Sequence, residues 1–256
     1  MTQALIGYTG FVGGNLLEQQ TFDDCYNSSN IEQIKGKSYN RITCAGVPAQ
    51  KWIANREPIQ DRKNIQSLIQ NLKSVKTEKF VLISTVDVYP NPIDVDEMSE
   101  IQLENCHPYG KHRLELEQFV SDHFDSIIIR LPALFGMGLK KNIIYDFLNN
   151  NNIEQINPKG IFQFYCLDHL SRDIETALEN DLKLINISSE PTSVIEIAQL
   201  CLGHPFNNEM DAAGIKYDYK SCYADLFGGN NGYLYSKDQV LSDLKSYINK
   251  EKFTTG

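Results

Sequence analysis

The 256-residue sequence has no long apolar segment, and it begins without the basic and apolar stretches of a secretory signal. Its longest apolar runs, such as residues 80–83 and 127–129, end far short of the roughly 18 residues that a membrane-spanning helix needs. We therefore expect a cytoplasmic protein with no membrane partner.

Basic residues are also scarce: 24 Lys and Arg stand against 33 Asp and Glu, and no basic cluster is visible. The formal net charge of −9 would repel a nucleic acid, so we expect no nucleic-acid partner. The six cysteines contain no C-x-x-C pair, and the five histidines lack the H-E-x-x-H spacing. These patterns predict reduced, structural thiols and no metal site.

Short apolar runs alternate with helical patterns along the chain, which is the order of a parallel sheet covered by helices. The strand candidates are residues 3–7, 25–27, 41–44, 79–84, 126–130, 162–165 and 184–187. The helix candidates are residues 12–20, 60–74, 108–122, 141–150, 167–179, 193–202 and 236–248. The sequence therefore predicts an α/β fold.

The sharpest local signal follows the first strand candidate, where the sequence reads Gly7-Tyr8-Thr9-Gly10-Phe11-Val12-Gly13. In this spacing the first glycine permits a tight turn and the second lets the backbone approach a pyrophosphate. The third lets the following helix pack close to the strand, and the helix N-terminus offers N–H groups to the anion. We predict a dinucleotide site here, and its candidate residues are Gly7, Gly10, Phe11, Val12 and Gly13.

The residues after the second strand candidate bear on the choice between NAD and NADP. An acid there would bind the ribose 2′-hydroxyl of NAD, whereas an arginine would accommodate the 2′-phosphate of NADP. The sequence has neither, because it reads Tyr26-Asn27-Ser28-Ser29-Asn30. Without a carboxylate nothing repels a 2′-phosphate, so the expected cofactor is NAD(P) with a slight lean to NADP. Asn27, Ser28 and Gly46 join the cofactor-binding candidates.

Further segments follow the glycine loop in a recognisable order. They read Ile83-Ser84-Thr85-Val86-Asp87-Val88-Tyr89, then Pro108-Tyr109-Gly110-Lys111, then Arg130-Leu131-Pro132-Ala133-Leu134-Phe135-Gly136. With these segments the chain resembles the extended short-chain dehydrogenase/reductase family, which contains nucleotide-sugar epimerases, dehydratases and 4-keto-sugar reductases. The likeness covers nearly the whole chain.

The resemblance implies a Rossmann-type doubly wound parallel sheet over residues 1–190 and a small carboxy-terminal substrate cap over residues 191–256. It also implies that Pro132 lies in the segment that walls the nicotinamide. The helix that carries Tyr109 would form a two-fold interface, so a homodimer is expected.

The chemistry that the resemblance implies moves a hydride between a sugar carbon and the nicotinamide, while a proton moves on the attached oxygen. Tyr109 is the candidate acid/base, and Thr85 would orient the substrate oxygen. A base at neutral pH needs its pKa lowered by about 3 units from the free value near 10, which a nearby cation achieves. The family has a lysine four residues after the tyrosine, but this chain has Arg113.

Arg113 keeps the charge and the helix face of the family's lysine, so we expect it to hold the nicotinamide ribose and to lower the pKa of Tyr109. The departure leaves open whether the enzyme is a working variant or an impaired one. The sequence predicts an oxidoreductase that reduces a nucleotide-linked 4-keto sugar. The alternatives are a nucleotide-sugar epimerase that uses bound NAD and a non-catalytic redox sensor that binds the dinucleotide.

Overall fold

The computed structural model describes residues 1–254, with side chains as far as Glu251. Contacts divide the chain into two compact units. The first unit consists of Met1–Asn91, Ser99–Leu131 and His169–Asn186. The second consists of Pro92–Met98, Pro132–Asp168 and the chain from Ile187 onward. Each unit is therefore built from segments that alternate along the chain. The boundary expected after residue 190 does not separate the two units.

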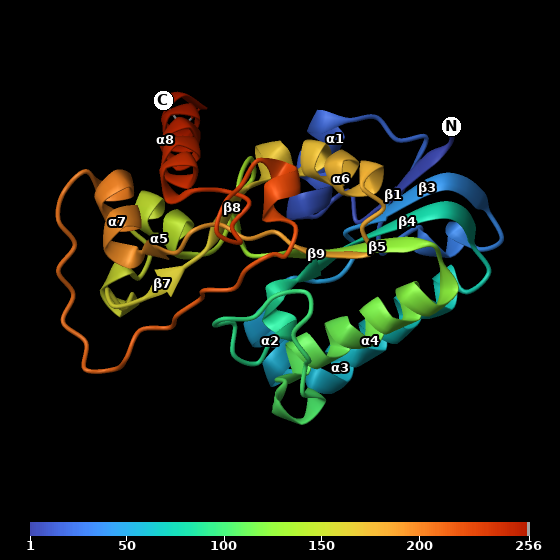
Figure 1. Ribbon diagram of the computed structural model, residues 1–256, viewed down its shortest axis with the longest axis horizontal. Helices are drawn as coiled ribbons and strands as arrows, with labels where there is room; N and C mark the ends of the chain where they lie inside the picture. Colours follow the sequence, from blue (N-terminus) through green and yellow to red (C-terminus); the bar gives the residue numbers. More distant parts are fainter. Residues whose placement is uncertain (255–256) are drawn as a thin grey trace. The chain divides into compact units, whose positions relative to one another are not determined.

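A six-stranded parallel sheet in the order β2-β1-β3-β4-β5-β9 forms the centre of the first unit (Figure 1). The strands are β1 (Gln3–Ile6), β2 (Asp24–Tyr26), β3 (Ser38–Cys44), β4 (Lys76–Thr85), β5 (Ser126–Leu131) and β9 (Leu184–Asn186). Every neighbouring pair runs parallel, as where Ile6 lies opposite Cys44. The predicted α/β fold of the Rossmann type is confirmed.

Helices cover both faces of this sheet. One face carries α1 (Phe11–Gln19) and α6 (Leu170–Glu179), and the other carries α3 (Pro58–Leu72) and α4 (Pro108–His123) (Figure 1). The sequence analysis missed α2 (Lys51–Arg56), because six residues are too few to show a helical period. Pro58 begins α3 at the position where a missing N–H costs nothing, which separates the two helices.

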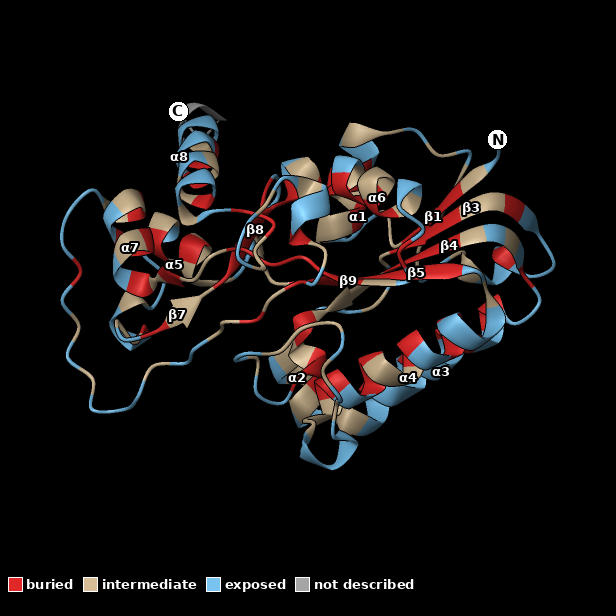
Figure 2. Cartoon of the chain, in the orientation of Figure 1, coloured by how far each residue is buried: buried red, intermediate tan, exposed pale blue. Residues whose placement is uncertain are grey.

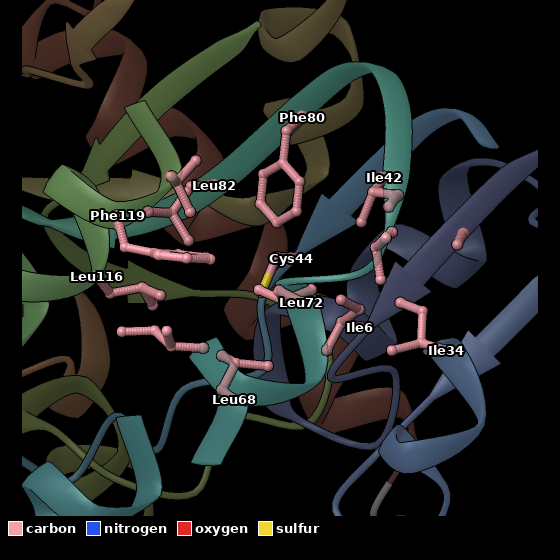
Figure 3. Packing of buried hydrophobic residues seen from close by; sticks show 14 of the residues in the cluster. Ile6, Ile34, Ile42, Cys44, Leu68, Leu72, Phe80, Leu82, Leu116 and Phe119 are labelled. Atoms are coloured by element: carbon pink, nitrogen blue, oxygen red, sulfur yellow. The ribbon is translucent and has the colours of Figure 1, made fainter. Parts of the chain in front are cut away.

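The core of the first unit lies between the sheet and the layer of α3 and α4. Strand residues that are buried on both faces, as throughout β5, are coloured red in Figure 2. Figure 3 shows how their side chains meet those of the helices, and the residues labelled there are Ile6, Ile34, Ile42, Cys44, Leu68, Leu72, Phe80, Leu82, Leu116 and Phe119. The aromatic ring of Phe80 also stacks on that of Phe124 at 4.7 Å.

The second unit contains two small sheets and three helices. In place of the single strand expected over residues 162–165, it has β7 (Ile161–Phe162) and β8 (Phe164–Cys166), which pair with different partners. β10 (Thr192–Ser193) pairs with β7, and β6 (Ala133–Phe135) pairs with β8. The helices are α5 (Ile143–Asn149), α7 (Val194–Leu202) and α8 (Lys237–Thr254).

Six short 3₁₀ helices complete the described secondary structure. They are η1 (Ile31–Ile34), η2 (Val86–Val88), η3 (Leu103–Asn105), η4 (Ile153–Gln155), η5 (Leu167–His169) and η6 (Ala224–Phe227). Within the described part of the chain, no helix combines the length and the apolar character that crossing a membrane requires.

A buried ion pair holds α4 against the carboxyl end of the sheet. The guanidinium of Arg130 on β5 donates to the carboxylate of Glu117 on α4 at 2.6 Å, and both side chains are about 95% buried. Arg130 also donates to the hydroxyl of Tyr89 at 2.9 Å, and Ser84 donates to Glu117. The charges therefore compensate one another inside a hydrogen-bonded network.

Replacing only one partner of this pair, as in Glu117→Gln, is expected to lower the free energy of unfolding by about 3–5 kcal/mol, because Arg130 would stay buried without its counter-charge. Urea denaturation measures the change. The control is the double variant Glu117→Leu, Arg130→Met, which should lose less than the single one. A single variant as stable as the native protein would contradict the assigned role.

Candidate functional site

The strand order reverses at the centre of the sheet, because β2 lies on one side of β1 and β3 lies on the other. Ligands of open α/β sheets bind at such a switch point, beyond the carboxyl ends of the strands. Here the first unit has a cavity of about 420 Å³. It is lined by Ile6, Gly7, Thr9, Gly10, Asn27, Ser28, Ile31, Ala45, Gly46, Val47, Pro48, Asn64, Ile65, Ser67, Leu68 and Asn71.

The glycine loop forms one wall of the cavity through close backbone approaches. Gly7 has φ +90°, and its N–H donates to the carbonyl of Tyr26 at 2.7 Å. A Cβ atom added to Gly7 would lie 2.5 Å from the carbonyl oxygen of Ala45. One added to Gly13 would collide with the carbonyl of Gly7. The loop therefore has the tight turn and the close helix packing that the sequence predicts.

Helix α1 starts directly after this loop. Its N-cap is Gly10, and among the described residues no side chain caps it there. The first-turn N–H groups of α1 therefore have no side-chain acceptor at the cap, and N–H groups in this position are able to bind an anion. Phe11 and Val12 occupy that first turn and, with Gly13, do not line the cavity, whereas Gly7, Gly10 and Gly46 do.

The loop after β2 forms the next part of the wall and is tied to the glycine loop. The side-chain oxygen of Asn27 accepts from the backbone N–H of Ser29 at 2.8 Å, and its amide donates to the hydroxyl of Tyr8 at 3.2 Å. Ser28 lies between these contacts and lines the cavity. Within the described chain, none of the cavity's lining residues is charged. This wall therefore has no carboxylate to accept from a ribose hydroxyl and no basic side chain to bind a phosphate.

A second cluster of polar side chains lies at the end of β4. Thr85 ends this strand, and its hydroxyl accepts from the N–H of Asp87 at 3.1 Å. Tyr109 is the second residue of α4, where its N–H donates to the side chain of Asn55 on α2 at 2.9 Å. Gly110 lets α4 lie against η2, since a Cβ there would collide with the carbonyl of Asp87. The structure therefore brings Thr85 and Tyr109 together, and their side chains are hydrogen-bonded.

The guanidinium of Arg113 lies against the ring of Tyr109. Its guanidinium carbon is 4.0 Å from the centre of the tyrosine ring, and its side chain is buried. The guanidinium donates to the carboxylate of Asp61 at 2.5 Å and to the carbonyl oxygen of Pro48. Because Pro48 lines the cavity, Arg113 connects the polar cluster to the cavity wall.

Burial raises the pKa of Tyr109 above its usual value near 10, although Arg113 acts to lower it. Nearby Asp87 and Asp61 raise this pKa further, while the hydrogen bond with Thr85 lowers it. Arg113 acts in the expected direction, but loss of hydration outweighs it, so the pKa of Tyr109 lies above its usual value and not below it. Tyr109 is a neutral phenol at neutral pH, and it is able to donate a proton.

Three further side chains beside Tyr109 were missed by the sequence analysis. Lys51, at the start of α2, forms an ion pair of 2.8 Å with Asp87, and His107 caps α4 by accepting from the N–H of Gly110. Burial and Lys51 lower the pKa of His107. Asp61 on α3 is the third. No local pattern marks Lys51 and Asp61, since the packing of α2 and α3 against α4 brings them to the site, whereas His107 precedes Tyr109 by two residues on the same segment.

Pro132, predicted to wall the nicotinamide, directly follows β5 and begins a segment of the second unit. The other candidates, Gly7, Gly10, Phe11, Val12, Gly13, Asn27, Ser28, Gly46, Thr85, Tyr109 and Arg113, belong to the first unit. Their roles toward a ligand stay predictions.

No protein-family model and no curated protein sequence matches the chain. Solved structures do. A UDP-glucose 4-epimerase from Thermotoga maritima, with UDP-glucose, has a TM-score of 0.76 at 15% identity, and the match covers 100% of both chains. A dTDP-4-dehydrorhamnose reductase from Bacillus anthracis, in complex with NADP, has a TM-score of 0.71 at 15% identity over 98% of this chain and 99% of that one. The protein MoeE5, in complex with UDP-glucose and NAD, has a TM-score of 0.70 at 14% identity over 100% of both.

The chain has the fold of the extended short-chain dehydrogenases/reductases. At these identities the likeness concerns the fold, and it confirms the architecture that the resemblance in sequence implies. It does not separate epimerases from reductases, because both kinds of enzyme are among the matches.

The variant Gly7→Ala is expected to be destabilised by about 1–3 kcal/mol, since alanine is strained at positive φ and its Cβ would press on Ala45. Gly14→Ala is the matched control. Gly14 lies inside α1, and a Cβ there would meet only Tyr8 at 3.8 Å, so this variant should gain about 0.5–1 kcal/mol. Thermal unfolding measures both, and equal effects would contradict the close approach at Gly7.

Proposed function

We propose that this protein is an NAD(P)-dependent oxidoreductase of the extended short-chain dehydrogenase/reductase family and that it reduces a nucleotide-linked 4-keto sugar. The observation that carries the proposal is the placement of two features in one compact unit. The glycine-walled cavity at the switch point and the Thr85–Tyr109–Arg113 cluster both lie at the carboxyl ends of parallel strands. Such ends are where α/β sheets bind cofactor and substrate.

The cavity suits a dinucleotide because two glycines of the loop, Gly7 and Gly10, line it and would let a pyrophosphate approach the main chain. Gly13 lies outside the lining and lets α1 pack close to the loop, since a Cβ there would collide with the carbonyl of Gly7. The first turn of α1 would hold the phosphates, while Asn27 and Ser28 would face the adenosine ribose. Gly46 would border the nicotinamide half. The cofactor, when bound, supplies the hydride.

Tyr109 would supply the proton in this reaction. Its raised pKa keeps the phenol protonated, which suits donation to a carbonyl oxygen while the carbon gains the hydride and becomes an alcohol. Solvent then returns a proton to the phenolate, and Thr85 would hold the substrate oxygen. The rate of reduction should therefore be constant below the pKa of Tyr109 and fall as the pH rises through it.

The remaining parts of the proposal concern substrate and assembly. Helix α4 would form a two-fold interface in a homodimer. The expected partner is a small nucleotide sugar, which is the substrate class of the proposed reaction.

Titration of the purified protein with NADH and NADPH, followed by nicotinamide fluorescence, is expected to show saturable binding of at least one form. Tyr109→Phe should bind the same form equally well but reduce 4-keto nucleotide sugars about 10²–10⁴-fold more slowly, because only the proton donor is lost. Cofactor absorbance measures the rate.

Three other outcomes would contradict the proposed reaction. Turnover of a nucleotide sugar without net consumption of cofactor would indicate an epimerase. A Tyr109→Phe variant that keeps full function would indicate the redox sensor. No binding of either dinucleotide would rule out the proposed use of the cavity.

Cofactor choice is expected to respond to single changes after β2, where the cavity wall is uncharged. Ser28→Arg should tighten binding of NADPH by about tenfold over NADH, because an arginine forms charge-assisted hydrogen bonds with a 2′-phosphate. Asn27→Asp should shift preference toward NADH, because a carboxylate repels that phosphate. Ratios of the dissociation constants measure the shift, and unchanged ratios in both variants would place the ribose elsewhere.

A further inference from the structure

We infer that Asp61 is a positioning residue, which clamps Arg113 against the ring of Tyr109 so that an arginine serves where the resembling family has a lysine. The inference rests on the proposed function for the role of Tyr109. The clamp itself is a matter of geometry and is tested without cofactor or substrate.

Contacts from different parts of the first unit hold the guanidinium of Arg113, which also donates to the backbone carbonyl of Tyr109 at 3.4 Å. Asp61 on α3 accepts from it at 2.5 Å, and the carbonyl oxygen of Pro48, in the segment between β3 and α2, accepts from its other terminal nitrogen. Its guanidinium carbon lies over the ring of Tyr109, 4.0 Å from the ring centre. Asp61 and Arg113 are both about 95% buried, so the pair is shielded from water.

The imidazole of His112 completes the surroundings of Asp61. Its Nδ1 lies 2.6 Å from the same carboxylate oxygen that accepts from Arg113. His112 and Arg113 therefore share one oxygen of the carboxylate, which holds the Asp61 side chain in one direction. This matters for an arginine, because its guanidinium acts on a neighbouring ring when it is held over the face of that ring.

The two charges have opposite effects on Tyr109. Arg113 lowers the pKa of Tyr109 and is the strongest charge acting on it, whereas Asp61 raises that pKa and is weaker. Asp87, paired with Lys51, also raises it. If Asp61 acted only through its charge, its removal would make the tyrosine more acidic. If Asp61 holds Arg113 in place, loss of the clamp makes the tyrosine less acidic.

The experiment places a fluorotyrosine at position 109, whose phenol is more acidic than that of tyrosine, and follows its ionisation by fluorine NMR. Asp61→Ala removes the acceptor, and we expect the pKa of residue 109 to rise by about one unit, because the cation is no longer held over the ring. Asp61→Asn removes the charge but keeps an acceptor for Arg113, so here the pKa should fall. Circular dichroism checks that each variant is folded.

A fall of the pKa in both variants would overturn the inference, because Asp61 would then act as a charge alone. No change in either variant would also overturn it. If Asp61→Ala does not fold, Asp61→Glu takes its place: it keeps the charge but moves the carboxylate by one methylene, and an unchanged pKa in it would contradict the clamp.

Dinucleotide binding, measured in parallel, keeps the two proposals apart. Failure of the native protein to bind NADH or NADPH would remove the proposed function, while the ionisation of residue 109 would still decide the role of Asp61. In a working enzyme, Asp61→Ala should lower kcat and move its alkaline limb upward without changing the dissociation constant of the cofactor. A merely structural role would not move that limb.

Discussion

The close approach of two backbone segments at the centre of the sheet is the constraint on which the site depends. Gly7 follows β1 and lies against Ala45 and Gly46, which follow β3, with no room for a side chain between them. Because β1 and β3 are parallel neighbours at the point where strand order reverses, both loops open toward the same edge. The cavity follows from this pairing, and its uncharged wall follows from the small residues that the pairing demands.

Burial is the second constraint, and it decides the protonation of the site. Placing α4 tightly against η2 requires Gly110 and puts Tyr109 beneath the surface, where losing water raises the pKa of the phenol more than Arg113 lowers it. The same packing buries Arg113, which must then find a counter-charge, and Asp61 provides it. The neutral tyrosine and the clamped arginine therefore have a common cause in the tight packing of α3, α4 and the end of β4.

Much of this could be predicted from sequence, because local patterns determine it. The glycine spacing, the apolar strands and the step from Tyr109 to Arg113 are features of short segments, and the strands and main helices lie within a few residues of their expected places. What could not be predicted depends on packing. Helix α2 is too short for a period, residues 162–165 divide between two sheets, and Asp61 reaches Arg113 across 52 residues of sequence. The direction in which the pKa of Tyr109 shifts depends on how far the phenol is buried, which the sequence does not show.

Arginine in place of lysine is consistent with this packing rather than at odds with it. Burial lowers the pKa of a lysine amine. A site beside Tyr109 that excludes water would therefore favour the neutral form of a lysine. A guanidinium stays charged there, lies over the tyrosine ring, and uses separate nitrogens for Asp61 and Pro48. The cost is that its position must be fixed by neighbours. The change at position 113 thus makes sense only together with the carboxylate on α3, and the two positions act as one unit in setting the acidity of Tyr109.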